Sequence, residues 1–237
     1  MTRRRWIADE VHGDTALLTG EHAEHLIRVL RAEVGQEFDI ATSTAVRRGK
    51  ITLISPGRVE FALGAEVGTR PSAHITLALA VFKFDRMEWA IEKCTEIGVK
   101  RIVPVVAGRT DAHLAAAASK RSERWQRISR QAAEQSRRAS PPAMAAPLEF
   151  KELLRMDFPH ATRVVLAETG GNKPLRDLLP PCGGEAVLAI GPEGGWTSDE
   201  LRMFSESGWA AASLGNNILR AETAAIVAVA LALDALR

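Results

Sequence analysis

The sequence predicts an α/β protein in which a small β-rich domain precedes a domain with a mainly parallel sheet. Short strand-like runs broken by Gly and Pro fill residues 1–70. From residue 72 onward, apolar runs of strand length alternate with helical patterns, as they do in βαβ units. The chain has 237 residues, 46% of them apolar and 25% charged, which suits one or two globular domains. We therefore expect two domains, residues 1–70 and residues 72–237.

The first domain is expected to contain one helix among four short strands. Four apolar residues recur at helical spacing and predict a helix over residues 21–30. The strands are expected at 16–18, 37–41, 50–55 and 58–63. Residues 68–71 are the expected linker to the second domain.

The second domain opens with a strand–helix–strand pattern. Ile75–Phe82 is almost continuously apolar, which is typical of a strand buried on both faces. The spacing of Asp85 and Glu88 predicts a capping box that starts a helix, and Gly98 is expected to end it. Arg101–Val106 is the next expected strand. A helix between two strands predicts that the strands pair in parallel.

The alternation continues to the end of the chain. A helix is expected over residues 122–137, and the spacing of Thr197 and Glu200 predicts a second capping box. Further strands are expected at 163–167, 186–190 and 211–214. Further helices are expected at 174–179, 198–207 and 222–236.

Several classes of protein are disfavoured by the composition. Two cysteines without a C-x-x-C pair argue against a disulfide scaffold or a cysteine zinc site. The longest apolar run, Ala224–Leu233, has ten residues and is too short to span a bilayer. The N-terminus lacks the apolar segment of a secretory signal. We therefore expect a cytoplasmic protein that does not cross a membrane.

No metal site is expected either. His22 and His25 have a spacing that metal ligands use, but no third ligand lies near them in the sequence. Their expected role is therefore on the surface or in packing. Cys94 falls on the apolar stripe of its helix, which predicts a core residue rather than a nucleophile.

Basic residues concentrate in one segment of the chain. Arginine outnumbers lysine 24 to 7, and residues 120–138 contain seven basic against two acidic side chains. Guanidinium groups match phosphates and stack on bases, so this segment favours a nucleic acid as partner. The alternative, a solvated helix face, stays open on charge alone.

Three glycine-containing loops follow three consecutive predicted strands. They cover residues 166–171, 190–196 and 214–220. Because ligands of open α/β sheets bind beyond the carboxyl ends of the strands, these loops are expected to wrap one flat polar ligand. The alternative is that each is an ordinary tight turn. The dinucleotide, P-loop, zinc-protease and nucleophile-elbow motifs are absent from the sequence.

Two of these loops resemble a known family. Gly191-Pro-Glu-Gly-Gly-Trp196 and Leu214-Gly-Asn-Asn-Ile-Leu-Arg-Ala-Glu-Thr-Ala224 closely resemble the two signature motifs of the small-subunit rRNA uridine-N3 methyltransferases, which belong to the SPOUT class. Segments 3–6, 25–31, 83–98 and 123–136 resemble the family in the same order. Departures from the family pattern occur at Trp196, Asn217 and Ala221, and at Arg137, where a glycine is common.

The resemblance implies a fold and a function. A PUA-like β-barrel domain, residues 1–70, would bind RNA. A SPOUT domain with a C-terminal trefoil knot, residues 72–237, would carry the reaction in a homodimer. Topology rules alone would have excluded a knot. The implied cofactor is S-adenosylmethionine, and the implied product is N3-methyluridine in 16S rRNA.

The implied site residues come from the three loops, the last helix and the arginines. The expected cofactor contacts are Leu166, Ala167, Glu168, Ile190, Gly191, Pro192, Glu193, Gly194, Gly195, Leu214, Gly215, Ile218, Leu219, Arg220, Thr223 and Ala224. The expected RNA contacts are Arg3, Arg4, Arg5, Arg28, Arg31, Arg124 and Arg138.

Arg220 and Glu222 are the expected catalytic residues. Uridine N3 carries a weakly acidic proton that must leave for N3 to attack, and Arg220 is suited to stabilise the resulting charge. Glu193 and Glu222 are the carboxylates nearest the loops, and either is expected to orient substrate or cofactor, unless Glu222 only complements the dipole of the last helix. Two other functions stay open: methylation of another RNA atom such as the ribose 2′-oxygen, and a non-catalytic role in ribosome assembly.

Overall fold

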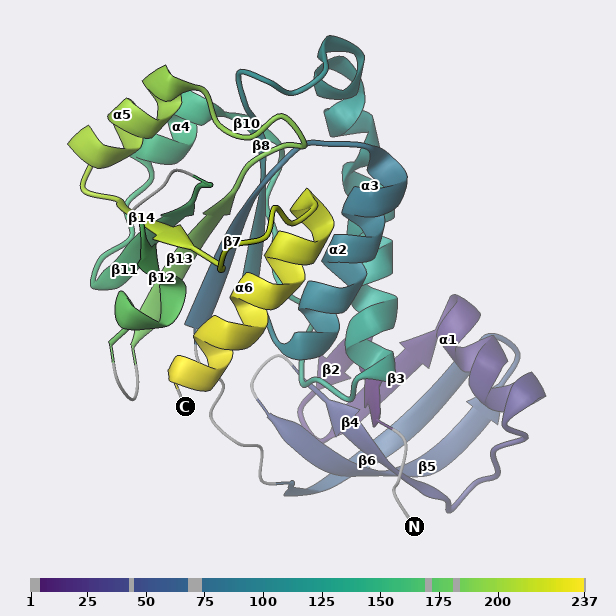
Figure 1. Ribbon diagram of the computed structural model, residues 1–237. Helices are drawn as coiled ribbons and strands as arrows, with labels where there is room; N and C mark the ends of the chain where they lie inside the picture. Colours follow the sequence, from purple (N-terminus) through teal and green to yellow (C-terminus); the bar gives the residue numbers. More distant parts are fainter. Residues whose placement is uncertain (1–4, 43–44, 68–73, 169–171, 181–183, 237) are drawn as a thin grey trace. The chain divides into compact units, whose positions relative to one another are not determined.

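The computed structural model describes residues 5–42, 45–67, 74–168, 172–180 and 184–236, in two compact units (Figure 1). The first unit is Met1–Pro71 together with Ala133–Pro141. The second is Ser72–Ala132 together with Pro142–Arg237. The expected linker, residues 68–71, lies outside the described residues, as do Arg3 and Arg4.

Residues 133–141 belong to the first unit, although the sequence placed them in the second domain. The reason is packing, because Ala133 is buried in one cluster with Ile7, Ala41 and Val46. A contact between residues so far apart in the chain leaves no periodic signal in the sequence.

The first unit is built on a sheet of six described strands, and only the β1–β4 pair is parallel. In sheet order they are β1 (Arg5–Ile7), β4 (Glu37–Ala41), β5 (Val46–Ser55), β6 (Arg58–Glu66), β3 (Thr15–Thr19) and β2 (Glu10–His12). The four predicted strands are confirmed. β1 and β2 were not expected, because three residues are too few to show an alternation.

One helical segment covers the core of the first unit. The predicted helix 21–30 forms as α1 (Gly20–Glu24) and continues as a π-helical turn, η1 (His25–Val29). Leu26 of this segment is buried with Leu18, Ile40 and Phe61 of the sheet. The periodicity that predicted the helix therefore marks the face that it buries.

The second unit contains a parallel sheet, as the sequence predicts. In sheet order the strands are β10 (Leu148–Glu149), β8 (Arg101–Val106), β7 (His74–Ala80), β13 (Glu185–Ile190), β11 (Ala161–Leu166), β14 (Ala210–Ser213) and β12 (Lys173–Pro174), with β9 (Ala143–Met144) beside β8. Every described pair in this sheet is parallel. In the register of β7 and β8, Leu77 lies opposite Ile102.

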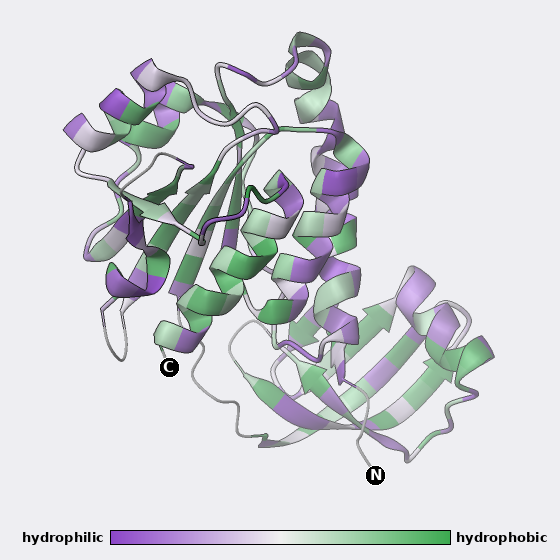
Figure 2. Ribbon diagram, in the orientation of Figure 1, coloured by the Kyte–Doolittle hydropathy of each residue, from purple (hydrophilic) through white to green (hydrophobic). Residues whose placement is uncertain are grey.

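Helices cover both faces of this sheet (Figure 1). On one face lie α2 (Phe84–Ile97), α3 (Ala112–Gln135) and α6 (Ala221–Ala235). On the other lie α4 (Phe150–Arg155) and α5 (Ser198–Glu206). Figure 2 shows apolar residues concentrated along the sheet strands and along α6. Each face of the sheet therefore has its own apolar core, and loops lie at the ends of the strands.

One of the two predicted capping boxes forms and the other does not. The Thr197 capping box is confirmed, since Thr197 accepts a bond from the Glu200 amide and the Glu200 carboxylate accepts one from the Thr197 amide. The Asp85 capping box is wrong, because the cap residue of α2 is Lys83, two residues earlier, and no side-chain bond forms there. Gly98 ends α2 with φ of 129°, as expected for a glycine stop.

Other helices differ in extent. α3 begins at Ala112, ten residues before the expected start, because its alanine-rich first turns have high helix propensity. α4 was not expected; its capping box uses Glu149 where the usual signal is Ser or Thr. The helix expected at 174–179 is only a 3-10 turn, η2 (Leu175–Asp177).

The structure also shows the surroundings of Cys94 and His22. Cys94 is fully buried, and burial raises the pKa of its thiol to about 12, which confirms a core residue. The His22 ring nitrogens lie 3.6 Å from Asp9 Oδ1 and 3.1 Å from Glu134 Oε1. Among the described residues, no group of three metal-ligating side chains occurs, and no helix has the length and apolar character to cross a membrane.

Candidate functional site

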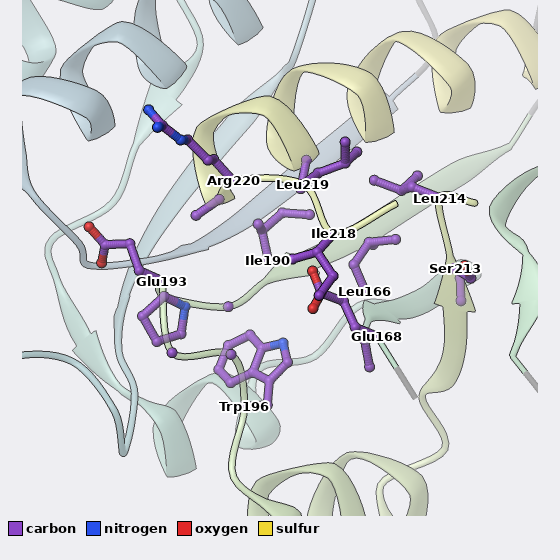
Figure 3. Close-up of a pocket in the computed structure, with 18 of the residues that line it drawn as sticks. Leu166, Glu168, Ile190, Glu193, Trp196, Ser213, Leu214, Ile218, Leu219 and Arg220 are labelled. Carbon is purple, nitrogen blue, oxygen red and sulfur yellow. The ribbon is translucent and has the colours of Figure 1, made fainter. Parts of the chain in front are cut away.

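A cavity of about 770 Å³ lies at the carboxyl ends of β11, β13 and β14 (Figure 3). The three glycine-containing loops that follow these strands meet there. Their lining residues include Leu166, Ala167, Glu168, Ile190, Gly191, Pro192, Glu193, Gly194, Gly195, Leu214, Gly215, Ile218, Leu219, Arg220 and Ala224. The three loops thus line one cavity, and the ligand that they are expected to wrap stays a prediction.

The loop after β13 contains a tight turn of a kind that favours glycine. The Gly195 amide donates to the Pro192 carbonyl at 2.8 Å, and Gly195 has φ of 68°. A Cβ on Gly191 would lie 3.3 Å from the backbone nitrogen of Trp196. The loop therefore folds closely on itself at Gly191, where a side chain would press against Trp196.

The loop after β11 carries the first acidic group of the cavity. The Ala167 amide donates to the Ala212 carbonyl at 3.1 Å, and Asn172 Nδ2 donates to the Ala167 carbonyl at 2.9 Å. These bonds hold the chain on both sides of Glu168. In Figure 3 the Glu168 side chain extends toward Ile218.

The loop after β14 leads into α6. Ser213 Oγ and Gly215 bond each other twice, with the hydroxyl donating to the Gly215 carbonyl at 3.0 Å and accepting from its amide at 3.1 Å. Ile218 is 83% exposed, an unusual state for a large apolar side chain beside a cavity.

Arg220 is the residue at which this loop becomes a helix. It is the N-cap residue of α6, and its carbonyl accepts a bond from the Ala224 amide at 2.8 Å. Its side chain is exposed and leaves the start of α6 on the same side of the cavity as Glu193 (Figure 3). A charged group is thus anchored by a helix at the rim of the cavity.

Two expected site residues are not among those that line the cavity. Glu222 and Thr223 lie in the first turn of α6, and Glu222 is only 5% exposed. Glu222 Oε1 lies 3.7 Å from Nη1 of Arg86, and its other oxygen has no hydrogen-bond partner among the described atoms. Arg86 itself lines the cavity, so Glu222 lies behind Arg86 and does not itself face a ligand in the cavity.

Arg86 and Arg109 also line the cavity, although neither was expected there from the sequence. Arg109 follows β8, and its Nη1 donates to the Gly194 carbonyl at 2.6 Å. The rule that ligands bind beyond strand ends applies to β8 as well, so a signal was present. Arg86 lies in the first turn of α2 and left no comparable signal.

The arginines expected to contact RNA have different surroundings. Arg28 is exposed with its Nε 2.5 Å from Glu24, and Arg124 makes two bonds to the Glu88 carboxylate, at 2.7 and 2.8 Å. Arg31 has φ of 49°. Burial lowers the pKa of Arg138 to about 10. Arg28 and Arg124 are therefore both exposed, and each is paired with a carboxylate.

Arg5 and Arg137 meet within the first unit. Arg5 donates to the carbonyl of Arg137, and burial lowers the pKa of Arg5 below its usual value. Arg137 has φ of 59°, the left-handed region that glycine adopts without strain. This conformation gives a physical reason for the glycine that is common at this position in the family that the sequence resembles.

Comparisons with known proteins find relatives over most of the chain. A family model described as an RNA methyltransferase domain matches residues 69–233. The chain is 34% identical to ribosomal RNA small subunit methyltransferase E of Synechocystis over 223 residues, covering 91% of this chain and 72% of that protein. It is 29% identical to the protein of the same name from Bacillus subtilis, covering 91% and 88%.

A solved structure is similar over nearly the whole chain. The ribosomal RNA small subunit methyltransferase E of Neisseria gonorrhoeae, crystallised with S-adenosyl methionine, matches with a TM-score of 0.85 and 30% identity. The match covers 97% of this chain and 96% of that one.

Proposed function

This chain belongs to the RNA methyltransferase family, and from that premise we propose that it transfers a methyl group from S-adenosylmethionine to N3 of a uridine in 16S rRNA. The observation that carries the proposal is the meeting of three glycine-containing loops in one cavity at the strand ends. The relative from Neisseria gonorrhoeae, crystallised with the cofactor, supports its first part. The choice of N3 rests on the resemblance of residues 191–196 and 214–224 to the uridine-N3 methyltransferases.

The residues of the cavity fit S-adenosylmethionine. The volume of about 770 Å³ is within the range of small-molecule sites. Leu166, Ile190 and Leu219 offer apolar surface for a flat adenine, and the glycine loops offer main-chain donors and acceptors. Glu168 and Glu193 complement the positive charges of the cofactor. When bound, the cofactor supplies an electrophilic methyl group.

The chain itself contributes positioning and charge. Arg220 would hold the uracil at the rim of the cavity and stabilise negative charge as N3 loses its proton. Because N3 of a paired base is hidden, the target uridine must be unpaired or flipped out.

Glu222 is proposed to act indirectly. Its buried carboxylate lies beside Arg86, which lines the cavity, so Glu222 would orient Arg86 and not contact substrate. Thr223 lies beside it in the same turn and is not a lining residue either. The proposed cofactor contacts are therefore the lining residues of the three loops and Ala224.

The fold proposal includes a trefoil knot and a PUA-like first domain. In support, β14 pairs with β11 and not with β13, so the chain crosses β11 after leaving β13. After β14 the chain continues as α6, which lies on the face of the sheet opposite to α5. The first unit, with its mostly antiparallel sheet, is proposed to bind RNA. Because its proposed substrate is small-subunit rRNA, the protein is proposed to act in the cytoplasm.

The experiment that tests this function is mass spectrometry of 16S rRNA nucleosides from a strain that lacks the protein. We expect one N3-methyluridine to disappear and to return when the gene is restored. Loss of a ribose-methylated nucleoside instead would favour 2′-oxygen methylation. A purified protein that shows no calorimetric binding of S-adenosylmethionine would favour a non-catalytic assembly factor.

A homodimer is proposed from the character of α6. This helix is apolar on all sides, and such helices are normally buried on all sides. In the single chain Leu231 of α6 is 41% exposed, and Trp89 of the neighbouring α2 is 47% exposed. A second copy of the chain is the proposed cover for this surface.

The Leu231→Glu variant is expected to be monomeric. A carboxylate on this apolar surface would have to be buried without a partner, which opposes association. Size-exclusion chromatography with light scattering measures the mass directly. Leu53→Glu, which alters a side chain that is 47% exposed in the first unit, is the control and should remain dimeric. A dimeric Leu231→Glu variant would place the interface elsewhere.

Replacing Arg3 and Arg4 together by alanine is expected to weaken RNA binding. Each phosphate contact that is lost should reduce the slope of log affinity against log salt concentration by roughly one. Filter binding at several salt concentrations measures the slope, and S-adenosylmethionine affinity should not change. An unchanged slope would show that these arginines do not contact phosphate.

A further inference from the structure

The turn that follows β8 is hydrogen-bonded to a loop that lines the cavity, although no sequence motif marks this turn. Thr110 holds the turn together: its amide donates to the Ala107 carbonyl at 2.9 Å, and its hydroxyl accepts from the Ala107 amide at 3.1 Å. The same hydroxyl donates to the Val81 carbonyl at 3.0 Å. The turn is therefore fixed to the ends of β7 and β8.

A buried carboxylate joins this turn to α5. Glu200 is 4% exposed; its Oε1 accepts from the Gly108 amide at 2.7 Å, and its Oε2 accepts from the Thr197 amide at 2.8 Å. Thr197 comes directly after the loop that lines the cavity. The turn after β8 and the end of that loop therefore share one anchor.

Arg109 reaches the loop from this anchored turn. Its Nη1 donates to the Gly194 carbonyl at 2.6 Å. A Cβ on Gly194 would lie 3.3 Å from Cδ and 3.5 Å from Cβ of Arg109, so the arginine side chain lies along the bare glycine backbone. The neighbouring Gly195 amide donates to the Pro192 carbonyl at 2.8 Å. Both ends of the Gly194–Gly195 peptide group are thus bonded.

A peptide group between two glycines can otherwise turn over at low cost. Neither residue has a Cβ that would restrict the rotation. Turning over would take the Gly194 carbonyl from Arg109 and the Gly195 amide from Pro192. Since a hydrogen bond to a charged donor is stronger than one between neutral groups, Arg109 selects one of the two orientations.

We propose that Arg109 is a positioning residue that fixes the Gly194–Gly195 peptide group in the orientation that the cofactor requires. This inference rests on the proposed function, because it takes residues 191–195 as part of the S-adenosylmethionine site. The cofactor then meets a loop that is already in its binding conformation. Arg109 needs no contact with the reacting atoms to have this effect.

The test compares Arg109→Ala and Arg109→Lys with a matched control, Arg202→Ala. Arg202 lies in α5, just beyond the same loop, and its bonds go to Asp199 and Glu206. We expect the dissociation constant for S-adenosylmethionine, measured by calorimetry, to rise about tenfold in Arg109→Ala. Arg109→Lys should recover part of the loss, and Arg202→Ala should bind as the wild type does. With saturating cofactor, kcat of Arg109→Ala should stay within about twofold of wild type, so that the loss falls on KM.

Hydrogen–deuterium exchange of the peptide that spans residues 191–196 is the second readout. Without cofactor, its exchange should be faster in Arg109→Ala than in the wild type and in Arg202→Ala. The inference would be overturned if Arg109→Ala and the wild type had equal cofactor affinity and equal exchange. It would also be overturned if Arg109→Ala failed to fold, or if Arg202→Ala lost as much cofactor affinity as Arg109→Ala. A wild type that binds no cofactor but shows the exchange difference would instead count against the proposed function.

Discussion

The Arg220→Ala variant should transfer methyl groups about 10²–10³ times more slowly than the wild type. Arg220 caps α6 at the rim of the cavity, where a uracil would enter, and its charge is anchored there by the helix. Removing one preorganised electrostatic contact at a reacting centre costs about 3–4 kcal/mol of transition-state stabilisation. A single-turnover assay with 16S rRNA and saturating cofactor measures the rate directly.

The design must separate a catalytic role from a structural one. Arg220→Ala should remain dimeric by size-exclusion chromatography and should bind S-adenosylmethionine with nearly the wild-type affinity. Arg176→Ala is the control, because this exposed arginine is not among the lining residues and pairs with Asp177. A monomeric Arg220→Ala variant would indicate a salt bridge across the dimer, and a dimer with near-normal turnover would end the catalytic assignment.

Replacing Gly191 with valine is expected to weaken S-adenosylmethionine binding by at least about 100-fold, roughly 3 kcal/mol. A Cβ at this position would lie 3.3 Å from the Trp196 backbone nitrogen and 3.4 Å from the Gly195 carbonyl carbon. Because both neighbours are backbone atoms, the loop would have to move. Calorimetry measures the affinity.

Gly64→Val is a suitable control for this substitution. Gly64 lies in β6 of the first unit, and a Cβ there would be 3.4 Å from the Arg48 carbonyl oxygen, an ordinary contact. Circular dichroism should show both variants folded, and only Gly191→Val should lose affinity. Unchanged affinity in Gly191→Val would move the cofactor site away from the loop after β13.

The elements of this protein were largely predictable because their signals are local. The apolar run at residues 75–82, the glycine stop at Gly98 and the capping box at Thr197 each depend on a few neighbouring residues. The three loops were predictable as a group as well, because parallel strands place their carboxyl ends at the same edge of a sheet. The resemblance of residues 191–196 and 214–224 then identified the family.

Other features depended on contacts between distant residues. Residues 133–141 join the first unit because Ala133 packs against residues more than 80 positions away. Glu222 lies within the second signature motif, yet its place on α6 puts its side chain beside Arg86 and not among the residues that line the cavity. Adjacency in sequence did not decide which of these side chains faces a ligand.

Arg109 shows the division most clearly. It lies 85 residues from Gly194, and neither residue predicts the other. Local propensity, capping and apolar periodicity operate over one or two turns of chain, so the sequence by itself determined the elements, the loops and the family. Which side chains meet across the sheet depends on strand order and on the packing of helices on each face. Only the tertiary structure decided that an arginine after β8 bonds the glycine loop after β13.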